Sequence, residues 1–257
     1  MEWFITLIVT FFAGMGAGLG TGFAGMSAAA VISPMLITFL GMEPYMAVGI
    51  ALSSDVLASA VSAYTYKKNG NLDMKNGLIM MLTVLLFTVV GSYASSLVPS
   101  GTMGGFSVSM TFFLGLKFIV RPVMATKESM GGVSPVKRAV QSVICGIVIG
   151  FICGFVGAGG GMMMLLILTS VLGYELKTAV GTSVFIMTFT ALTGAAAHFG
   201  IGGAPDWTVM AQCVIFTFLW ARVAAIFANK ADPKTLNRAT GAVLVVLGTA
   251  IFLFNLL

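Results

Sequence analysis

The sequence GTGFAGMS at residues 20–27 has a counterpart in GFVGAGGG at residues 154–161, and the GFxG motif they share lies at 22–25 and again at 154–157. Two further motifs recur at the same offset: LGxE, at 40–43 and 172–175, and AVG, at 47–49 and 179–181. Over residues 14–70, 14 of 57 positions match the second copy without a gap. The glycines matched at this offset are Gly14, Gly18, Gly22, Gly25, Gly41, Gly49 and Gly70, with Gly146, Gly150, Gly154, Gly157, Gly173, Gly181 and Gly202. The chain is therefore predicted to contain two copies of one unit.

The composition is that of a membrane protein. Of 257 residues, 58% are apolar and only 8% are charged, and the mean hydropathy is +1.05. A soluble domain carries about 25% charged residues. We therefore expect an all-α integral membrane protein, whose net charge of +5 belongs to its loops and not to a nucleic-acid-binding surface.

Each copy is predicted to contain five apolar segments, ten in total. They lie at 3–21, 26–41, 44–66, 76–98 and 103–123 in the first copy, and at 136–154, 159–173, 176–199, 207–228 and 236–257 in the second. Because five is odd, the second copy would enter the membrane upside down relative to the first, as in many secondary transporters. The expected domains are an inverted repeat at 1–123, a cytoplasmic linker at 124–135 and a second inverted repeat at 136–257.

The distribution of charge predicts the orientation in the membrane. With ten segments, all 13 Lys and Arg residues fall in or near loops on one side, and the opposite side carries acids such as Glu2, Glu43 and Asp206. An alternative with eight segments divides the Lys and Arg residues between the two sides. Since cytoplasmic loops are enriched in Lys and Arg, we expect the basic loops to be cytoplasmic and both termini to be outside, in the plasma (inner) membrane of a prokaryote.

The first two segments of each copy predict a helical hairpin with a glycine-rich tip. The second arms, 26–41 and 159–173, reach only roughly 22 Å, which is short of the hydrocarbon core of about 30 Å. We expect tips near the midplane, one from each side, although the parity of the segments does not distinguish re-entrant from fully spanning hairpins. Both short helices would then point their N-termini inward, where about one positive charge in total and unpaired N–H groups suit an anion.

The candidate binding residues lie at these tips and in the segments that follow them. Glycines allow the backbone to approach a ligand, and hydroxyl groups of the next segments lie at a similar depth. The substrate-binding candidates are Gly25, Ser27, Ser53, Ser54, Gly157, Gly159, Gly160, Gly161, Thr182 and Ser183. Asp55 is the candidate for coupling to a proton or ion, because an ionised carboxylate in mid-membrane costs about 2.5–3.5 kcal/mol. Neutralisation by nearby hydroxyl groups is the alternative for Asp55.

Other residues have a structural interpretation. The four-residue spacing of Gly14, Gly18 and Gly22 predicts a helix-packing face. Tyr66 and His198 are expected to be anchors at the membrane interface, and Arg222 is expected to extend its charge out of the apolar region.

The duplicated GFxG turn, the following LG and then AVG(T/I)(S/A) resemble the TauE/SafE family of sulfite exporters, over both halves of the chain. This resemblance implies a membrane permease whose cargo is a small sulfur oxyanion or an organosulfonate. The first copy departs from the glycine-rich form, because Met26, Ser27 and Ala28 stand where the second copy has Ala158, Gly159 and Gly160.

These observations lead to the expectation of a secondary transporter that exports a small anion by alternating access. The alternative is a cation- or proton-coupled permease for another small metabolite, with Asp55 as the ion ligand. We expect no enzymatic activity, no cofactor and no metal, since the chain has one His and scattered Cys residues and lacks HExxH and GxSxG motifs. The expected partners are membrane lipid, the anionic substrate and a coupling proton or cation, with no nucleic acid; the sequence does not indicate an oligomeric state.

Overall fold

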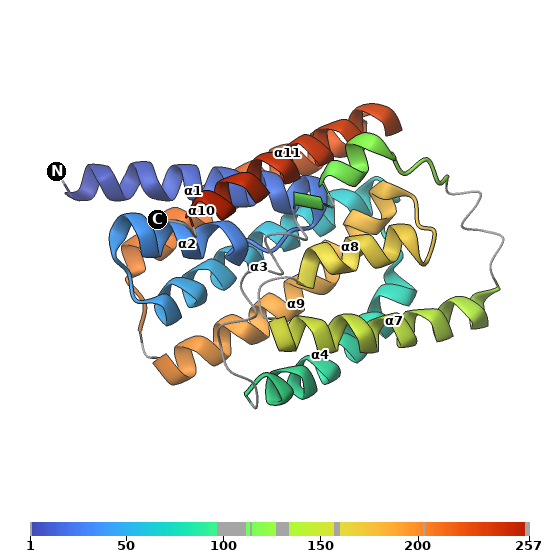
Figure 1. Cartoon of the computed structure of the whole chain (residues 1–257), viewed down its shortest axis with the longest axis horizontal. Coiled ribbons are helices and arrows are strands. Elements are labelled where there is room, and N and C mark those ends of the chain that lie inside the picture. The colour runs from blue at the N-terminus through green and yellow to red at the C-terminus, as the bar shows by residue number, and fades with distance from the viewer. Residues whose placement is uncertain are drawn as a thin grey trace.

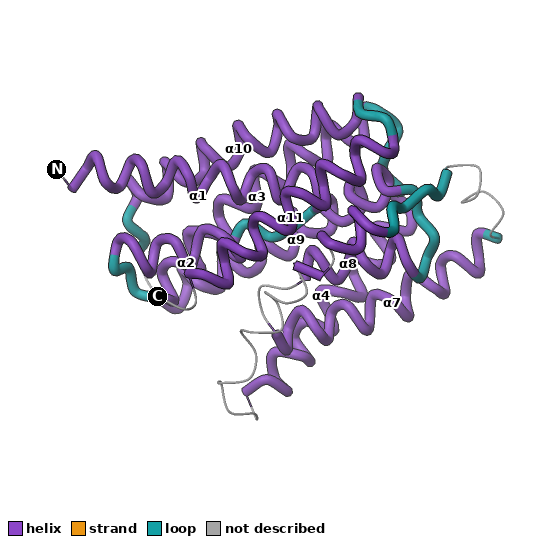
Figure 2. The backbone as a smooth tube through the Cα atoms, turned by 45° about the horizontal axis from the view of Figure 1, so that its top comes forward, coloured by secondary structure: helices purple, strands orange, loops and turns teal. Residues whose placement is uncertain are grey.

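The computed structural model describes residues 2–96, 112, 113, 115–126, 134–156, 160–202 and 204–254, and these residues form helices joined by loops, without a strand (Figures 1 and 2). The helices of the first half are α1 (Glu2–Ala24), α2 (Ala29–Leu40), α3 (Pro44–Lys68) and α4 (Met74–Ser96). Those of the second half are α7 (Pro135–Val156), α8 (Gly160–Ser170), α9 (Leu176–Gly202), α10 (Trp207–Lys230) and α11 (Pro233–Phe254). Residues 115–120 are also helical and fall within the predicted segment 103–123.

The helix ends follow from local residues. The Glu43 carboxylate accepts a hydrogen bond from the Met46 backbone N–H at 2.9 Å and so caps α3. Asp206 caps α10 in the same way, by accepting from two backbone N–H groups of the first turn. Gly41 and Gly173, which are equivalent positions of the two copies, follow α2 and α8 with φ of 60° and 66°. Only glycine adopts this left-handed conformation at little cost, so Gly41 ends α2 directly, and Gly173 turns the chain three residues after the end of α8.

Helices α1 and α10 pack side by side and run in the same direction. A Cβ atom added to Gly14 would lie 3.0 Å from the backbone nitrogen of Thr217, and one added to Gly18 would lie 2.7 Å from that of Ala221. Because a larger residue would collide with backbone rather than with a flexible side chain, the glycine spacing lets the two helices approach closely. The predicted helix-packing face is therefore found at this contact.

Helices α4 and α7 repeat this arrangement elsewhere in the molecule. A Cβ atom on Gly146 would lie 3.1 Å from the Met80 carbonyl oxygen, and one on Gly150 would lie 2.6 Å from the Val84 carbonyl oxygen. The contacts advance together along both helices, so α7 runs parallel to α4. Helices α3 and α9 lie between these two pairs (Figure 1).

The central helices α3 and α9 run in opposite directions. Gly194 of α9 contacts Leu52 in the first half of α3, whereas Gly181 near the start of α9 contacts Tyr66 near the end of α3. Helix α2 extends from the middle of the bundle toward the end at which α1 begins, and α8 extends toward the opposite end (Figure 1).

Four described helices are long and apolar enough to cross a membrane: Trp3–Ala24, Pro44–Lys68, Leu176–Ala196 and Trp207–Lys230. Helix α1 has 23 residues and is about 34 Å long, whereas α2 has only 12 residues. Helix α1 stays helical along α10 as far as Gly22, which contacts Ala224 and Ala225 in the last two turns of that helix.

We predict that Gly18→Ala destabilises the protein and that Gly16→Ala, on the same helix, does not. The new methyl group at position 18 would overlap the backbone of α10, whereas at position 16 it would meet the movable side chains of Val31 and Leu247 at 3.2 Å. Overpacking of this kind costs about 1–3 kcal/mol. Thermal unfolding of both variants in detergent would measure the difference, and equal melting temperatures would contradict the packing analysis.

Candidate functional site

The connection from α1 to α2 turns at Gly25, which has φ of 60°. Its backbone N–H donates to the Thr21 carbonyl at 2.9 Å, and the Thr21 hydroxyl donates to the Met26 carbonyl at 2.8 Å. The Tyr66 hydroxyl of α3 donates to the Gly22 carbonyl at 2.8 Å. These hydrogen bonds provide partners for backbone groups at the buried end of α1. Without such partners, burying these polar groups would cost free energy. Tyr66 is fully buried, so the expectation that it is an interfacial anchor is wrong.

The two halves of the chain meet at this turn. A Cβ atom on Gly161, in the first turn of α8, would lie 2.1 Å from the Gly25 carbonyl oxygen. A Cβ atom on Gly25 would in turn lie 2.2 Å from the Ser183 hydroxyl oxygen of α9. Three predicted binding residues, one from the first copy and two from the second, are therefore in direct contact. Only glycine permits this approach at positions 25 and 161.

The first turn of α2 is occupied by a carboxylate from α3. Asp55 is 1% exposed and accepts a hydrogen bond from the Ser59 hydroxyl at 3.0 Å. It also hydrogen-bonds to the Ser27 side chain and to the backbone of Ala28, where α2 begins. Asp55 is the twelfth of the 25 residues of α3, so the N-terminus of α2 lies beside the middle of that helix. In its ionised form the carboxylate would compensate the positive end of the α2 dipole.

The Ser27 hydroxyl also accepts a hydrogen bond from the Ala29 backbone N–H at 3.4 Å, within the first turn of α2. The N-cap residue of α2 itself, Ala28, has no side-chain capping hydrogen bond. Ser27 thus joins the helix terminus to the Asp55 carboxylate.

The first turn of α8 has a different neighbour. Helix α8 begins at Gly160, and the residue opposite Gly161 is Met187, whose sulfur would lie 2.6 Å from an added Cβ atom. Met187 is the twelfth residue of α9 and occupies the position in the second copy that Asp55 occupies in the first. A thioether therefore faces α8 where a carboxylate faces α2. The candidates Gly157 and Gly159 lie outside the described residues.

The remaining hydroxyl candidates form hydrogen bonds within the protein. Ser53 and Ser54 donate to the Gly49 and Ile50 carbonyls, both at 3.0 Å. Ser183 donates to the Val180 carbonyl at 2.9 Å. Such bonds to the preceding turn are common for hydroxyl groups in helices, and they leave the oxygen lone pairs available as acceptors.

Sequence reasoning missed two serines that lie on the Asp55 face of α3. Ser59 and Ser62 follow Asp55 by four and seven residues, which is the spacing of one helical face. Both are fully buried, and the Ser62 hydroxyl has no hydrogen-bond partner among the described residues. The Ser33 hydroxyl of α2 is likewise buried without a described partner. The i, i+4, i+7 pattern was the signal that could have identified this face.

A polar cluster joins the halves at the end of the bundle where α3 leads into α4. Asp73 accepts hydrogen bonds from the Tyr174 hydroxyl at 2.8 Å and the Asn76 amide at 2.7 Å. The Asp73 backbone N–H donates to the Thr182 hydroxyl at 3.2 Å, so this predicted binding residue serves a loop contact. The Arg138 guanidinium lies 4.9 Å from the centre of the Tyr174 ring. Burial and the Asp73 carboxylate raise the pKa of the Tyr174 phenol, which therefore stays a hydrogen-bond donor at neutral pH.

Comparison with known proteins finds relatives that match nearly the whole chain. The protein named "Probable membrane transporter protein YunE" of Bacillus subtilis (strain 168) is 27% identical over 246 residues, covering 90% of this chain and 89% of the relative. "Probable membrane transporter protein YdhB" of the same organism is 25% identical, covering 92% and 91%. "Probable membrane transporter protein ORF9" of a Sinorhizobium species is 25% identical, covering 91% and 87%. No solved structure matches the chain.

The family model described as "Sulfite exporter TauE/SafE" matches residues 10–251. This range includes both glycine-tipped connections, the Asp55 cluster and the contact between the two halves. The expected resemblance is therefore confirmed, and the chain belongs to the TauE/SafE sulfite exporter family of membrane transporters.

Proposed function

We propose that this protein is a secondary transporter that exports a small anion, sulfite or an organosulfonate, by alternating access of two inverted halves. The observation that carries the proposal is the contact between Gly25 and Gly161, where the turn before α2 meets the first turn of α8 in the middle of the bundle. Family membership supports transport as such. The nature of the cargo is inferred from the family and from the sign of the charge at the helix N-termini.

Inverted topology is supported by the directions of equivalent helices. Helices α3 and α9 occupy matching places in the two copies and run in opposite directions through the centre of the molecule. Helix α1 packs along α10, and α7 packs along α4 in the same way. The first helix of each half therefore packs against the fourth helix of the other half. Inverted repeats that exchange contacts in this way allow one structure to open alternately to the two sides of a membrane.

We assign the substrate anion to the first turn of α8. Gly160 and Gly161 offer backbone N–H groups without side chains, and a helix N-terminus of this kind favours negative charge. The Ser183 hydroxyl lies at the same contact and adds an acceptor or donor for an oxyanion. The contact between Gly25 and Gly161 is too close to admit a solute, so the two turns separate during the proposed cycle.

We assign Asp55 to coupling. Its carboxylate at the start of α2 acts as an internal anion that compensates one of the two converging helix dipoles. When Asp55 carries a proton, the N-terminus of α2 also becomes attractive to the substrate, which links anion binding to protonation. The basic loops are assigned to the cytoplasm and the termini to the outside, in accord with the enrichment of Lys and Arg in cytoplasmic loops.

The second candidate function is a cation-coupled permease for another small metabolite. It is favoured by the oxygen-rich face of α3, where the Asp55 carboxylate and the hydroxyls of Ser59 and Ser62 lie together. Oxygen ligands of this kind suit a hard cation. Dependence of transport on a particular cation in place of a proton gradient would favour this candidate.

We predict that Gly161→Ala reduces anion flux at least about tenfold, because a methyl group would collide with the Gly25 carbonyl oxygen and misplace the binding turn. The assay is uptake of radiolabelled sulfite by proteoliposomes, compared with sulfate and short sulfonates. Gly200→Ala is the matched control, since no described residue lies within 4 Å of its new methyl group. Normal flux in Gly161→Ala would refute the site, and absence of saturable anion flux in the unaltered protein would refute the function.

We predict that Asp55→Asn abolishes the dependence of anion flux on a pH gradient, because an amide of the same shape cannot gain or lose the coupled proton. Exchange of anion across the membrane without a gradient should continue. Asp206→Asn is the control: this exposed residue only caps α10, so its change should cost about 1 kcal/mol of stability at most and leave coupling intact. Unchanged gradient dependence in Asp55→Asn would exclude the coupling role.

A further inference from the structure

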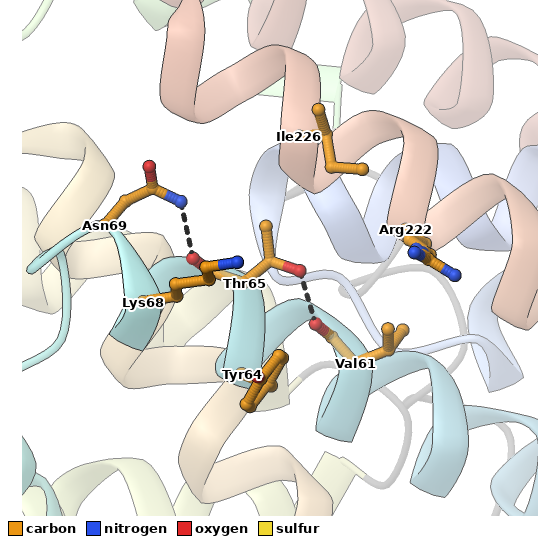
Figure 3. A pocket seen from close by; sticks show the side chains of 7 residues that line it. All are labelled: Val61, Tyr64, Thr65, Lys68, Asn69, Arg222 and Ile226. Atoms are coloured by element: carbon orange, nitrogen blue, oxygen red, sulfur yellow. Dashed lines mark hydrogen bonds between the residues drawn. The ribbon is translucent and has the colours of Figure 1, made fainter.

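A groove of about 480 Å³ lies between α3 and α10, away from the contact of the two hairpins. Lys68 and Tyr64 of α3 border it on one side, and Arg222 and Ile226 of α10 on the other (Figure 3). The groove thus lies at a seam between the two halves of the chain. Arg222, expected from the sequence to extend its charge outward, is exposed here.

The groove has an uncompensated positive charge. Two of the seven lining residues are cationic, and none of them is acidic. Within the described part of the chain, neither Lys68 nor Arg222 forms a hydrogen bond or ion pair. The polar neighbours Thr65 and Asn69 direct their hydrogen bonds to the backbone of α3, at 2.7 Å and 2.8 Å (Figure 3). The two cations therefore lack a counter-charge from the residues that the structure describes.

The surface next to the groove is apolar. Leu57 precedes Val61 by one turn of α3 and is 48% exposed. Ile215 and Leu219, on the face of α10 that leads to Ile226, are 55% and 49% exposed. These apolar side chains form one row on α3 and one on α10. Each row extends from the groove toward the middle of a helix that is long enough to span a membrane. Lys68 ends α3, whereas Arg222 lies eight residues before the end of α10, about 12 Å along the helix.

We propose that this groove binds an anionic phospholipid, with the phosphate between Lys68 and Arg222 and an acyl chain along the apolar rows of α3 and α10. A phosphate supplies the missing counter-charge, and both cationic side chains can extend toward the headgroup region. The exposed Tyr64 ring suits the boundary between headgroup and acyl chain. A soluble phosphate compound would satisfy the charges but would leave the apolar rows without a ligand.

The test is native mass spectrometry of the intact protein in detergent, titrated with phosphatidylglycerol or with zwitterionic phosphatidylcholine. The double variant Lys68→Gln/Arg222→Gln should bind phosphatidylglycerol about tenfold to thirtyfold more weakly, since each cation near a membrane surface contributes about 1 kcal/mol. The matched control is Lys234→Gln/Arg238→Gln, which removes the same two residue types from exposed positions on α11. It should change affinity less than about twofold.

A second variant, Lys68→Arg/Arg222→Lys, keeps both charges and should keep the affinity, which separates charge from a folding defect. Equal binding of phosphatidylglycerol to the unaltered protein and the Gln variant would overturn the proposal. The proposal would also be overturned if the unaltered protein bound phosphatidylcholine as tightly as phosphatidylglycerol. The same holds if inorganic phosphate displaced bound phosphatidylglycerol as effectively as added glycerophospholipid does. Loss of binding in the charge-preserving variant would show that the site does not recognise charge.

Discussion

The arrangement of this protein depends on one backbone contact, in which the Gly25 carbonyl oxygen occupies the space that a Cβ atom at position 161 would need. This contact joins the first hairpin to the second and brings two short helices to the same place. Any side chain at either position would separate the turns, because the space is filled by backbone and by Ser183. The long helices support the contact from both sides, through the glycine faces of α1 on α10 and of α7 on α4. Glycine thus acts at two levels, in the approach of helices and in the approach of turns.

The two halves share their helical plan but differ in chemistry at the centre. Asp55 hydrogen-bonds to the first turn of α2, and Met187 lies against the first turn of α8. A duplicated unit with identical chemistry would present two equivalent positive helix ends. Here one end is compensated by a carboxylate and the other faces a thioether, so the proposed binding and coupling roles fall on different halves. The first copy thus departs from the glycine-rich pattern at the same helix end that has a carboxylate, Asp55, beside it.

One end of the bundle is held by polar contacts that cross between the halves. The cluster around Asp73 and Tyr174 connects the loop after α3 with the loop before α9. The groove with Lys68 and Arg222 lies on the outside of the bundle, between α3 and α10. A conformational change that moves one half against the other would alter both regions, because each is built from both copies. In the proposed transport cycle, lipid in the groove and the Asp73 cluster would therefore each bias the equilibrium between states.

The sequence by itself predicted the duplication, and it determined the helical class and the approximate bounds of the described helices. The constant offset between matching motifs and the long apolar segments can be read along the chain, and a glycine such as Gly41 ends a helix through its own backbone conformation. The sequence also indicated Asp55 and the glycine tips as unusual groups. The tip at 157–159 lies outside the described residues, and so does most of the linker at 124–135. What the sequence predicts for these two segments remains a prediction.

Only the tertiary structure decided which groups meet. The burial of Tyr66, the pairing of Asp55 with the start of α2, and the use of Thr182 by the Asp73 loop all join residues that are far apart in the sequence. Periodicity in a single segment indicates which face of a helix is buried, but it does not identify the partner. That partner is set by how closely two backbones can approach, and this depends on small residues on both helices at once.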